Sequence, residues 1–117
     1  MTPAPIKPEI SFDDLDKLDI RIGTILAVEE VEKSRKLVCL IVDFGDHERR
    51  ILSGMKQERE SFDSIIGVQA LFVVNLPTKK MAGVESQGML FDIGYADGVK
   101  PALATPEHPV PNGSRAG

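Results

Sequence analysis

The sequence has no tryptophan, one cysteine and two histidines in 117 residues. The single cysteine, Cys39, excludes an internal disulfide and any metal site built from several thiolates. Apolar runs are short, whereas a membrane-spanning helix needs about 20 consecutive apolar residues. The first ten residues also lack the apolar stretch of a secretory signal. We therefore expect a cytoplasmic protein that does not associate with a membrane.

Few side chains in the sequence are suited to catalysis or to metal binding. Neither His47 nor His108 lies near a candidate nucleophile, and no phosphate-binding glycine loop or dinucleotide motif is present. Cys39 falls within an apolar run, where a cysteine packs as an inert side chain. The aspartates of residues 13–19 lack the glycine and the terminal glutamate of a calcium loop. We expect no enzymatic activity, no metal and no cofactor.

The charge of the chain is unevenly distributed. The formal net charge is −4, so no overall positive field attracts nucleic acid. Residues 1–32 carry eight acids and three bases, whereas residues 33–117 carry ten acids and eleven bases. A local basic surface is therefore compatible with the acidic total.

The two ends of the chain differ in pattern from its middle. Residues 1–10 contain three prolines, which oppose both helix and strand pairing, and we expect a flexible arm. Residues 105–117 also contain three prolines and show no periodicity, which predicts an extension that drapes over another surface or hangs free. Residues 11–104 carry the patterns of a single domain.

Alternating or continuous apolar residues predict that this domain has five strands. They cover residues 19–31, 37–44, 47–52, 69–76 and 88–95. Gly23 indicates a bulge or a sharp bend in the first strand. The second strand is apolar on both faces, which predicts that both faces are covered. Residues 77–87 are expected to form a polar connection, and residues 99–103 a short edge strand.

Two short helices are also predicted. Ser11 and Asp14 have the spacing of a capping box, which predicts a helix over residues 12–18. Residues 57–66 are a second helical candidate, ended by Gly67. The predicted class is therefore all-β: a five-stranded OB-fold barrel with a short N-terminal helix and a helix between strands 3 and 4. An SH3-like barrel is the alternative, but it lacks the second helix.

The basic residues occur in small groups at turns and strand ends. These groups comprise Lys33, Arg35, Lys36, Arg49, Arg50, Lys56, Lys79 and Lys80. Such positions on a small barrel can converge into a patch that binds phosphates, or they can be ordinary solvated loop charges. Aromatic residues are too few for a platform that stacks successive bases, so the composition favours recognition of folded RNA by shape.

Several motifs in this order resemble the tRNA-binding domain family. They are Asp19–Ile25, Lys36-Leu37, Val42–Gly45, Arg50–Gly54, Asn75–Pro77, Lys79–Met81, Gly83, Ser86–Leu90, Thr105-Pro106 and Val110–Gly113. The family includes stand-alone dimeric tRNA-binding proteins, appendages of methionyl- and tyrosyl-tRNA synthetases, and an export-related chaperone. The resemblance implies an OB-fold that dimerises through segments flanking the barrel and binds the outer corner of tRNA. It implies no catalysis.

The resemblance also implies a set of RNA-facing residues. They are Lys36, Arg50, Asn75, Lys79, Lys80, Ser86 and Met89. The basic side chains would bind phosphates, and Asn75 and Ser86 would hydrogen-bond phosphates or ribose hydroxyls. Alternatively, Asn75 and Ser86 satisfy backbone groups and Met89 belongs to the core. Lys79 and Lys80 are the strongest candidates, since adjacent loop lysines need no structural role.

Two functions follow from these observations. The first is binding of structured tRNA by a homodimer, with an aminoacyl-tRNA synthetase as a possible further partner and residues 105–117 packed at the dimer interface. The second is a chaperone-like dimer that holds unfolded peptide segments in an apolar groove. Phosphate binding depends steeply on salt concentration, whereas peptide binding by burial does not.

Overall fold

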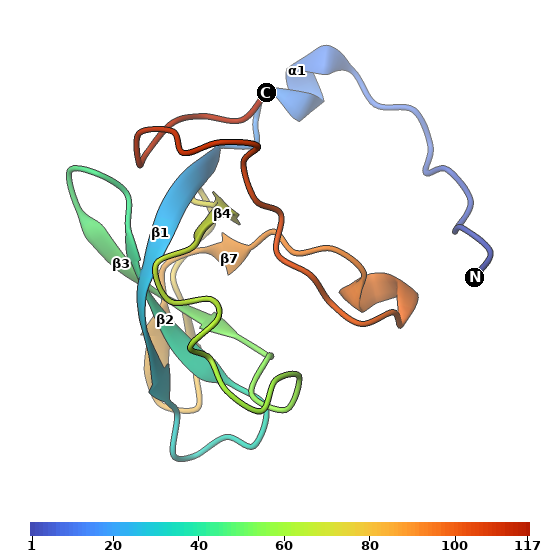
Figure 1. Ribbon diagram of the computed structural model, residues 1–117. Coiled ribbons are helices and arrows are strands. Elements are labelled where there is room, and N and C mark those ends of the chain that lie inside the picture. Colours follow the sequence, from blue (N-terminus) through green and yellow to red (C-terminus); the bar gives the residue numbers. More distant parts are fainter.

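The computed structural model describes residues 1–117 and shows a mostly β protein whose main sheet curls into a half-barrel (Figure 1). Five antiparallel strands form this sheet in the order β3-β2-β1-β4-β7. They are β1 (Ile20–Glu30), β2 (Val38–Asp43), β3 (Glu48–Ser53), β4 (Gln69–Val73) and β7 (Met89–Leu90). The predicted OB-like class is confirmed. The predicted fifth strand is shorter than expected, and residues 99–103 contribute only a bridge between Ile93 and Ala102.

The two edge strands of the half-barrel, β3 and β7, meet without forming a ladder. The Gln87 amide donates to the Arg50 carbonyl at 2.9 Å. The Leu52 amide donates to the Ser86 hydroxyl at 3.0 Å. These bonds join β3 to the residues just before β7, so the turn at residues 86–88 closes one side of the barrel.

The bulge in β1 lies at Leu26 rather than at Gly23. The register with β2 shifts between Ile25 and Ala27, so that Ile25 is fully buried and Leu26 is exposed. Gly23 is needed for a different reason. A Cβ atom at this position would lie 2.4 Å from Val42 Cγ1 and 2.9 Å from Phe44 Cε1. The glycine therefore allows close packing inside the barrel.

The prediction that both faces of β2 are covered is confirmed. Its inner face, with Leu40 and Val42, belongs to the main core, and its outer face contributes Cys39 to a second small core. The cover of the outer face is a hairpin of β5 (Lys79–Met81) and β6 (Val84–Ser86), where the sequence predicted a polar connection. Ala82 and Gly83 both have positive φ, as a tight two-residue hairpin turn requires.

The predicted helices are only partly present. The structure has α1 (Phe12–Leu15) and a 3₁₀ turn, η1 (Tyr95–Asp97). The Ser11 side chain caps α1 by accepting from the Asp14 amide at 3.1 Å, which confirms the N-cap. The helix expected over residues 57–66 was wrong, because this segment forms consecutive turns. Its Ser61 hydroxyl accepts from the Asp63 amide, and such local bonds compete with helix formation.

The C-terminal extension packs along β1 of its own chain. The Ile22 amide donates to the Ser114 carbonyl at 2.9 Å, and the Gly113 amide donates to the Ile22 carbonyl at 2.8 Å. The Asn112 side chain accepts from Thr24 and Gln69, both at 2.8 Å. By contrast, residues 1–10 are exposed throughout and extend away from the barrel (Figure 1). No helix has the length and apolar character that crossing a membrane requires.

Candidate nucleic-acid interface

The two adjacent lysines lie on the hairpin that covers the outer face of β2. Lys79 and Lys80 are both exposed, and neither forms an ion pair. The hairpin is held in place because Met81, Ala82 and Val84 pack against the second small core. We refer to Lys79 and Lys80 on this hairpin as the hairpin surface. It presents two cationic side chains on a fixed backbone.

Two further predicted cations lie on β3 and in the loop before β2. Arg50 lies on β3 and forms an ion pair with Glu29 at 2.9 Å, which partly neutralises its charge. The hydrogen bond that Arg50 donates to Glu29 raises the pKa of the guanidinium. Lys36 is exposed in the loop before β2, and its carbonyl accepts from the Lys56 amide at 3.0 Å. Its side chain forms no ion pair.

The remaining three candidates have different surroundings. Ser86 is buried, and its hydroxyl accepts from the Leu52 amide and donates to the Gly88 carbonyl, both at 3.0 Å. Its hydroxyl is therefore occupied within the protein. Met89 is 46% exposed on β7 and is available for an apolar contact.

Asn75 joins the end of β4 to the segment after α1. Its Oδ1 accepts from the Asp19 amide at 2.8 Å, and its Nδ2 donates to the Lys17 carbonyl at 2.6 Å. The structure thus shows the backbone-satisfying role for Asn75 and Ser86 that the sequence left open.

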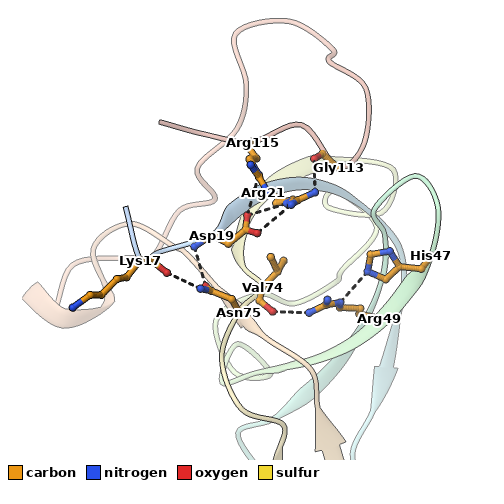
Figure 2. Close-up of polar contacts among 9 residues, drawn as sticks. All are labelled: Lys17, Asp19, Arg21, His47, Arg49, Val74, Asn75, Gly113 and Arg115. Atoms are coloured by element: carbon orange, nitrogen blue, oxygen red, sulfur yellow. Dashed lines mark hydrogen bonds and ion pairs between the residues drawn. The ribbon is translucent and has the colours of Figure 1, made fainter. Parts of the chain in front are cut away.

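A second group of polar side chains surrounds one end of the barrel (Figure 2). This mouth cluster consists of Asp19, Arg21, Phe44, His47, Arg49, Val74, Asn75 and Arg115. Arg21 binds Asp19 through two parallel bonds, Nε to Oδ1 at 2.9 Å and Nη2 to Oδ2 at 3.1 Å. Arg49 donates from Nη1 to the carbonyls of Val74 at 2.7 Å and Gln87 at 3.0 Å.

Sequence reasoning placed Arg49 among the basic groups but missed Arg21 and Arg115. The spacing of Asp19 and Arg21 puts both on one face of a strand, which is a usable signal for an ion pair. No sequence signal brings Arg115 to the same place. Arg115 lies there because the C-terminal extension forms an antiparallel β-bridge between Arg115 and Arg21 of β1.

The electrostatics of the mouth cluster favour the ionised forms of Asp19 and Arg21. The hydrogen bond from Arg21 lowers the pKa of Asp19, and the positive charges of Arg115 and Arg49 act in the same direction. The hydrogen bond with Asp19 raises the pKa of Arg21. The His47 ring lies 2.6 Å from Asp46, and this hydrogen bond lowers the pKa of the Asp46 carboxyl.

The third surface is an apolar groove beside α1. Its volume is about 580 Å³, and six of its twelve lining residues are apolar: Leu15, Leu18, Ile20, Leu71, Phe91 and Ala116. The other six include Asp19, Asn75 and Arg115 of the mouth cluster, so the groove adjoins that cluster. Leu15, Leu18 and Phe91 are each about half exposed. The structure has no group of three or more histidine, cysteine, aspartate or glutamate side chains placed to hold a metal ion.

This combination defines a class of protein: a small OB-like half-barrel with exposed cations on one side and an apolar groove beside its N-terminal helix. The family model described as "Putative tRNA binding domain" matches residues 20–115. The chain belongs to this tRNA-binding domain family.

The relatives of the chain include longer enzymes and small domains. It is 44% identical over 109 residues to a methionine–tRNA ligase of Archaeoglobus fulgidus and 42% identical over 110 residues to that of Clostridium acetobutylicum. These matches cover 93% and 94% of this chain but only 16% and 17% of the ligases.

Solved structures also match nearly the whole chain, and two of them illustrate this. The MetRS related protein from Pyrococcus horikoshii has a TM-score of 0.84 and 36% identity, and the match covers 94% of this chain and 99% of that one. The chaperone CsaA from Bacillus anthracis has a TM-score of 0.80 and 29% identity, with 94% and 100% of the two chains covered. The fold is thus shared with proteins of two different descriptions.

Proposed function

We propose that this chain binds structured tRNA without catalysing a reaction, as a homodimer and in the cytoplasm. The observation that carries the proposal is the hairpin surface, where Lys79 and Lys80 are exposed and free of ion pairs in a member of the tRNA-binding domain family. Lys36 and Arg50 would add phosphate contacts, and Met89 an apolar one. Ser86 and Asn75 would contribute by holding the backbone of this region.

The fixed hairpin suits recognition by shape. Folded RNA is recognised through phosphates and ribose hydroxyls at defined positions in space. Because the β5–β6 turn is packed against Val31, Cys39 and Leu52, its lysine backbone positions need no ordering when RNA binds. Association with an aminoacyl-tRNA synthetase is a further part of the proposal, supported by the similarity to methionine–tRNA ligases.

The apolar groove supports the dimer. Leu15, Leu18 and Phe91 expose apolar surface in the groove, and Phe12, on the same helix as Leu15, is 84% exposed. Exposed apolar patches of this kind mark protein–protein contacts. We propose that the groove of one subunit packs against the same region of a second copy. The C-terminal residues Ala116 and Gly117 line the groove and would lie at this interface.

The test is a titration of fluorescently labelled tRNA with the wild-type protein and with a Lys79→Ala, Lys80→Ala variant at several salt concentrations. We expect the variant to bind several-fold more weakly. The slope of log K against log salt should fall by about 1.4–1.8, from two lost phosphate contacts at about 0.7–0.9 each. The melting temperature should not change, because both side chains are exposed and unpaired.

The matched control is a Lys7→Ala, Lys100→Ala variant, which removes the same charge from two exposed lysines outside the barrel face. It should retain the wild-type slope. An equal loss of affinity in both double variants would indicate a general charge effect and would refute the hairpin surface as the site. An unstructured RNA of equal length should compete poorly.

A second candidate function is peptide binding, and the likeness to CsaA chaperone structures together with the apolar groove favours it. In that case an unfolded peptide would occupy the groove that the dimer proposal assigns to a second subunit. Peptide binding would depend weakly on salt and would be lost on introducing a charge at Leu15. It would be unaffected by the change at Lys79 and Lys80.

A further inference from the structure

We infer that the mouth cluster is a second phosphate site, which binds a backbone phosphate of the same RNA that the hairpin surface contacts. This inference rests on the proposed function for the identity of the RNA. It adds Arg21, Arg49 and Arg115 to the interface, at the end of the barrel. The site consists of a cavity of about 210 Å³ lined by every member of the mouth cluster except Arg115. Arg115 lines the adjoining groove and lies 3.8 Å from Asp19, which borders both cavities (Figure 2).

The charges in the mouth cluster leave an excess of positive charge. Three guanidinium groups surround Asp19, and all three lower its pKa. Arg21 occupies both oxygens of that carboxylate. Arg115 lies 3.8 Å from Asp19, and Arg49 has no carboxylate partner. The other nearby carboxylate, Asp46, is 89% exposed and is turned to His47.

The donors of Arg49 are placed before any ligand binds. Its Nε donates to His47 Nε2 at 3.0 Å, and its Nη1 donates to two backbone carbonyls. The guanidinium also lies 5.8 Å from the centroid of the Phe44 ring. These contacts fix the plane of the group and leave Nη2 without a protein partner. A donor held in this way loses little conformational entropy when it binds an anion.

Arg115 supplies the adaptable part of the site. Its side chain is 72% exposed, and its one ion pair is a long contact of 3.8 Å between Nε and Asp19, so its Nη donors are available. The bridge between Arg21 and Arg115 fixes its backbone beside the cluster. Guanidinium groups bind phosphate oxygens through paired N–H donors more effectively than ammonium groups do. The site therefore combines one fixed arginine, Arg49, with one adaptable arginine, Arg115, near the same carboxylate, Asp19.

The size and position of the cavity fit a single phosphate group of an RNA. Pockets for drug-sized molecules have volumes of about 300–1,000 Å³, so a cavity of 210 Å³ suits a single phosphate group better than a whole nucleotide. The site is also linked to the hairpin surface through the backbone of residues 86–87. Arg49 donates to the Gln87 carbonyl, and the preceding residue, Ser86, pairs with Lys79. A phosphate bound at the mouth and one bound at Lys79 can thus belong to one RNA.

The first experiment compares tRNA binding by Arg115→Ala and by Lys100→Ala, which removes the same charge elsewhere. Because Arg115 is exposed, its removal should leave the melting temperature unchanged. We expect Arg115→Ala to weaken tRNA binding about three- to tenfold and to lower the salt slope by about 0.7–0.9. Equal affinity and slope in Arg115→Ala and the wild type would overturn the inference.

The second experiment tests the site without RNA. Inorganic phosphate should shift the NMR signals of the Arg21 and Arg49 Nε–H groups in the wild-type protein, and acetate should shift them less. Equal shifts with acetate, or no shift with phosphate, would overturn the assignment to phosphate. If phosphate shifts these signals but tRNA binds nowhere on the protein, the proposed function fails and RNA is excluded as the source of the phosphate.

Discussion

The hairpin surface and the apolar groove are built from opposite kinds of side chain. The hairpin surface exposes Lys79 and Lys80, while its apolar residues Met81 and Val84 pack inward on a small core. The apolar groove leaves Leu15 and its neighbours half exposed beside a four-residue helix that contains no buried residue. One region hides its apolar side chains and displays charge, whereas the other displays its apolar side chains to solvent.

This difference shows that the two regions suit different partners. A charged surface on a fixed backbone suits a polyanion, because the attraction needs no reshaping of the protein. An exposed apolar groove suits a protein surface that can exclude water from it. The two regions are joined through Asn75, which lines the groove and lies in the connection from β4 to β5. Variants that remove one region and spare the other therefore test whether two separate partners exist.

The largest expected effect comes from disrupting the barrel that carries both regions. In Gly23→Val, the new side chain would overlap Val42 and Phe44, whose atoms lie 2.4 and 2.9 Å from the place that a Cβ at residue 23 would occupy. We expect a loss of about 3 kcal/mol or more in the free energy of unfolding, or failure to fold. Thermal unfolding followed by circular dichroism measures this loss.

Gly54→Ala is the control for this change. A Cβ at Gly54 meets no atom within 4 Å. Its effect should stay within about 0.5 kcal/mol. An unchanged melting temperature in Gly23→Val would show that the barrel can move Val42 and Phe44 apart, and the packing role of the glycine would be refuted.

The next largest effect is expected from a variant that changes the apolar groove and leaves the hairpin surface intact. Leu15→Glu places a charge in the apolar groove, which should prevent a second subunit from packing there. Light scattering at micromolar concentration should give a mass of one chain in place of two. Loss of the second subunit's phosphate contacts should weaken tRNA binding by about tenfold or more.

Leu26→Glu is the matched control, because Leu26 is similarly exposed but lies at the bulge of β1, outside the groove. It should stay dimeric. The Lys79→Ala, Lys80→Ala variant should also stay dimeric while losing tRNA affinity. If the wild-type protein is itself a monomer, or if Leu15→Glu leaves the mass unchanged, the groove is not a dimer interface.

The sequence predicted the barrel well because most of its strands can be recognised from the pattern of neighbouring residues. Alternation in β1 and the continuous apolar run of β2 need only neighbouring residues to be recognised. The hairpin at Lys79–Ser86 was missed because each of its strands is only three residues long. The signal that marks it is the Ala82-Gly83 turn, where both residues have positive φ.

The candidate site was less predictable, since its geometry depends on contacts between distant segments. The exposure of Lys79 and Lys80 follows from their own polarity. The burial of Ser86, however, requires β3 to approach the turn at residues 86–88. The mouth cluster requires the C-terminal extension to bring Arg115 beside Arg21. No local pattern encodes either approach, so only the folded chain shows them.

The smallest expected effect concerns Asp19, which lines both the groove and the cavity of the mouth cluster. Its pKa is lowered below the ordinary 3.8, chiefly by the hydrogen bond from Arg21. Because the pKa of Asp19 is lower in the folded protein than in the unfolded chain, ionisation of this carboxyl stabilises the fold. The stabilisation is complete above the ordinary pKa of 3.8 and is lost as the pH falls through the lowered pKa of the folded protein. In the Asp19→Asn variant this stabilisation should be absent at every pH. The melting temperature at pH 7 should therefore be about 2–4 °C below that of the wild type, and the gap should close in acid.

Asp16→Asn is the control for Asp19→Asn, since Asp16 is exposed and forms no ion pair. The melting temperature of Asp16→Asn should equal that of the wild type both at pH 7 and in acid. Because Asp19→Asn also removes a negative charge from the mouth cluster, tRNA binding should be equal to or tighter than that of the wild type. Weaker binding would mean that Asp19 matters for RNA through the position of Arg21 rather than through charge. A gap of constant size from pH 7 to acid would mean that its hydrogen bonds, and not its ionisation, stabilise the junction between groove and mouth.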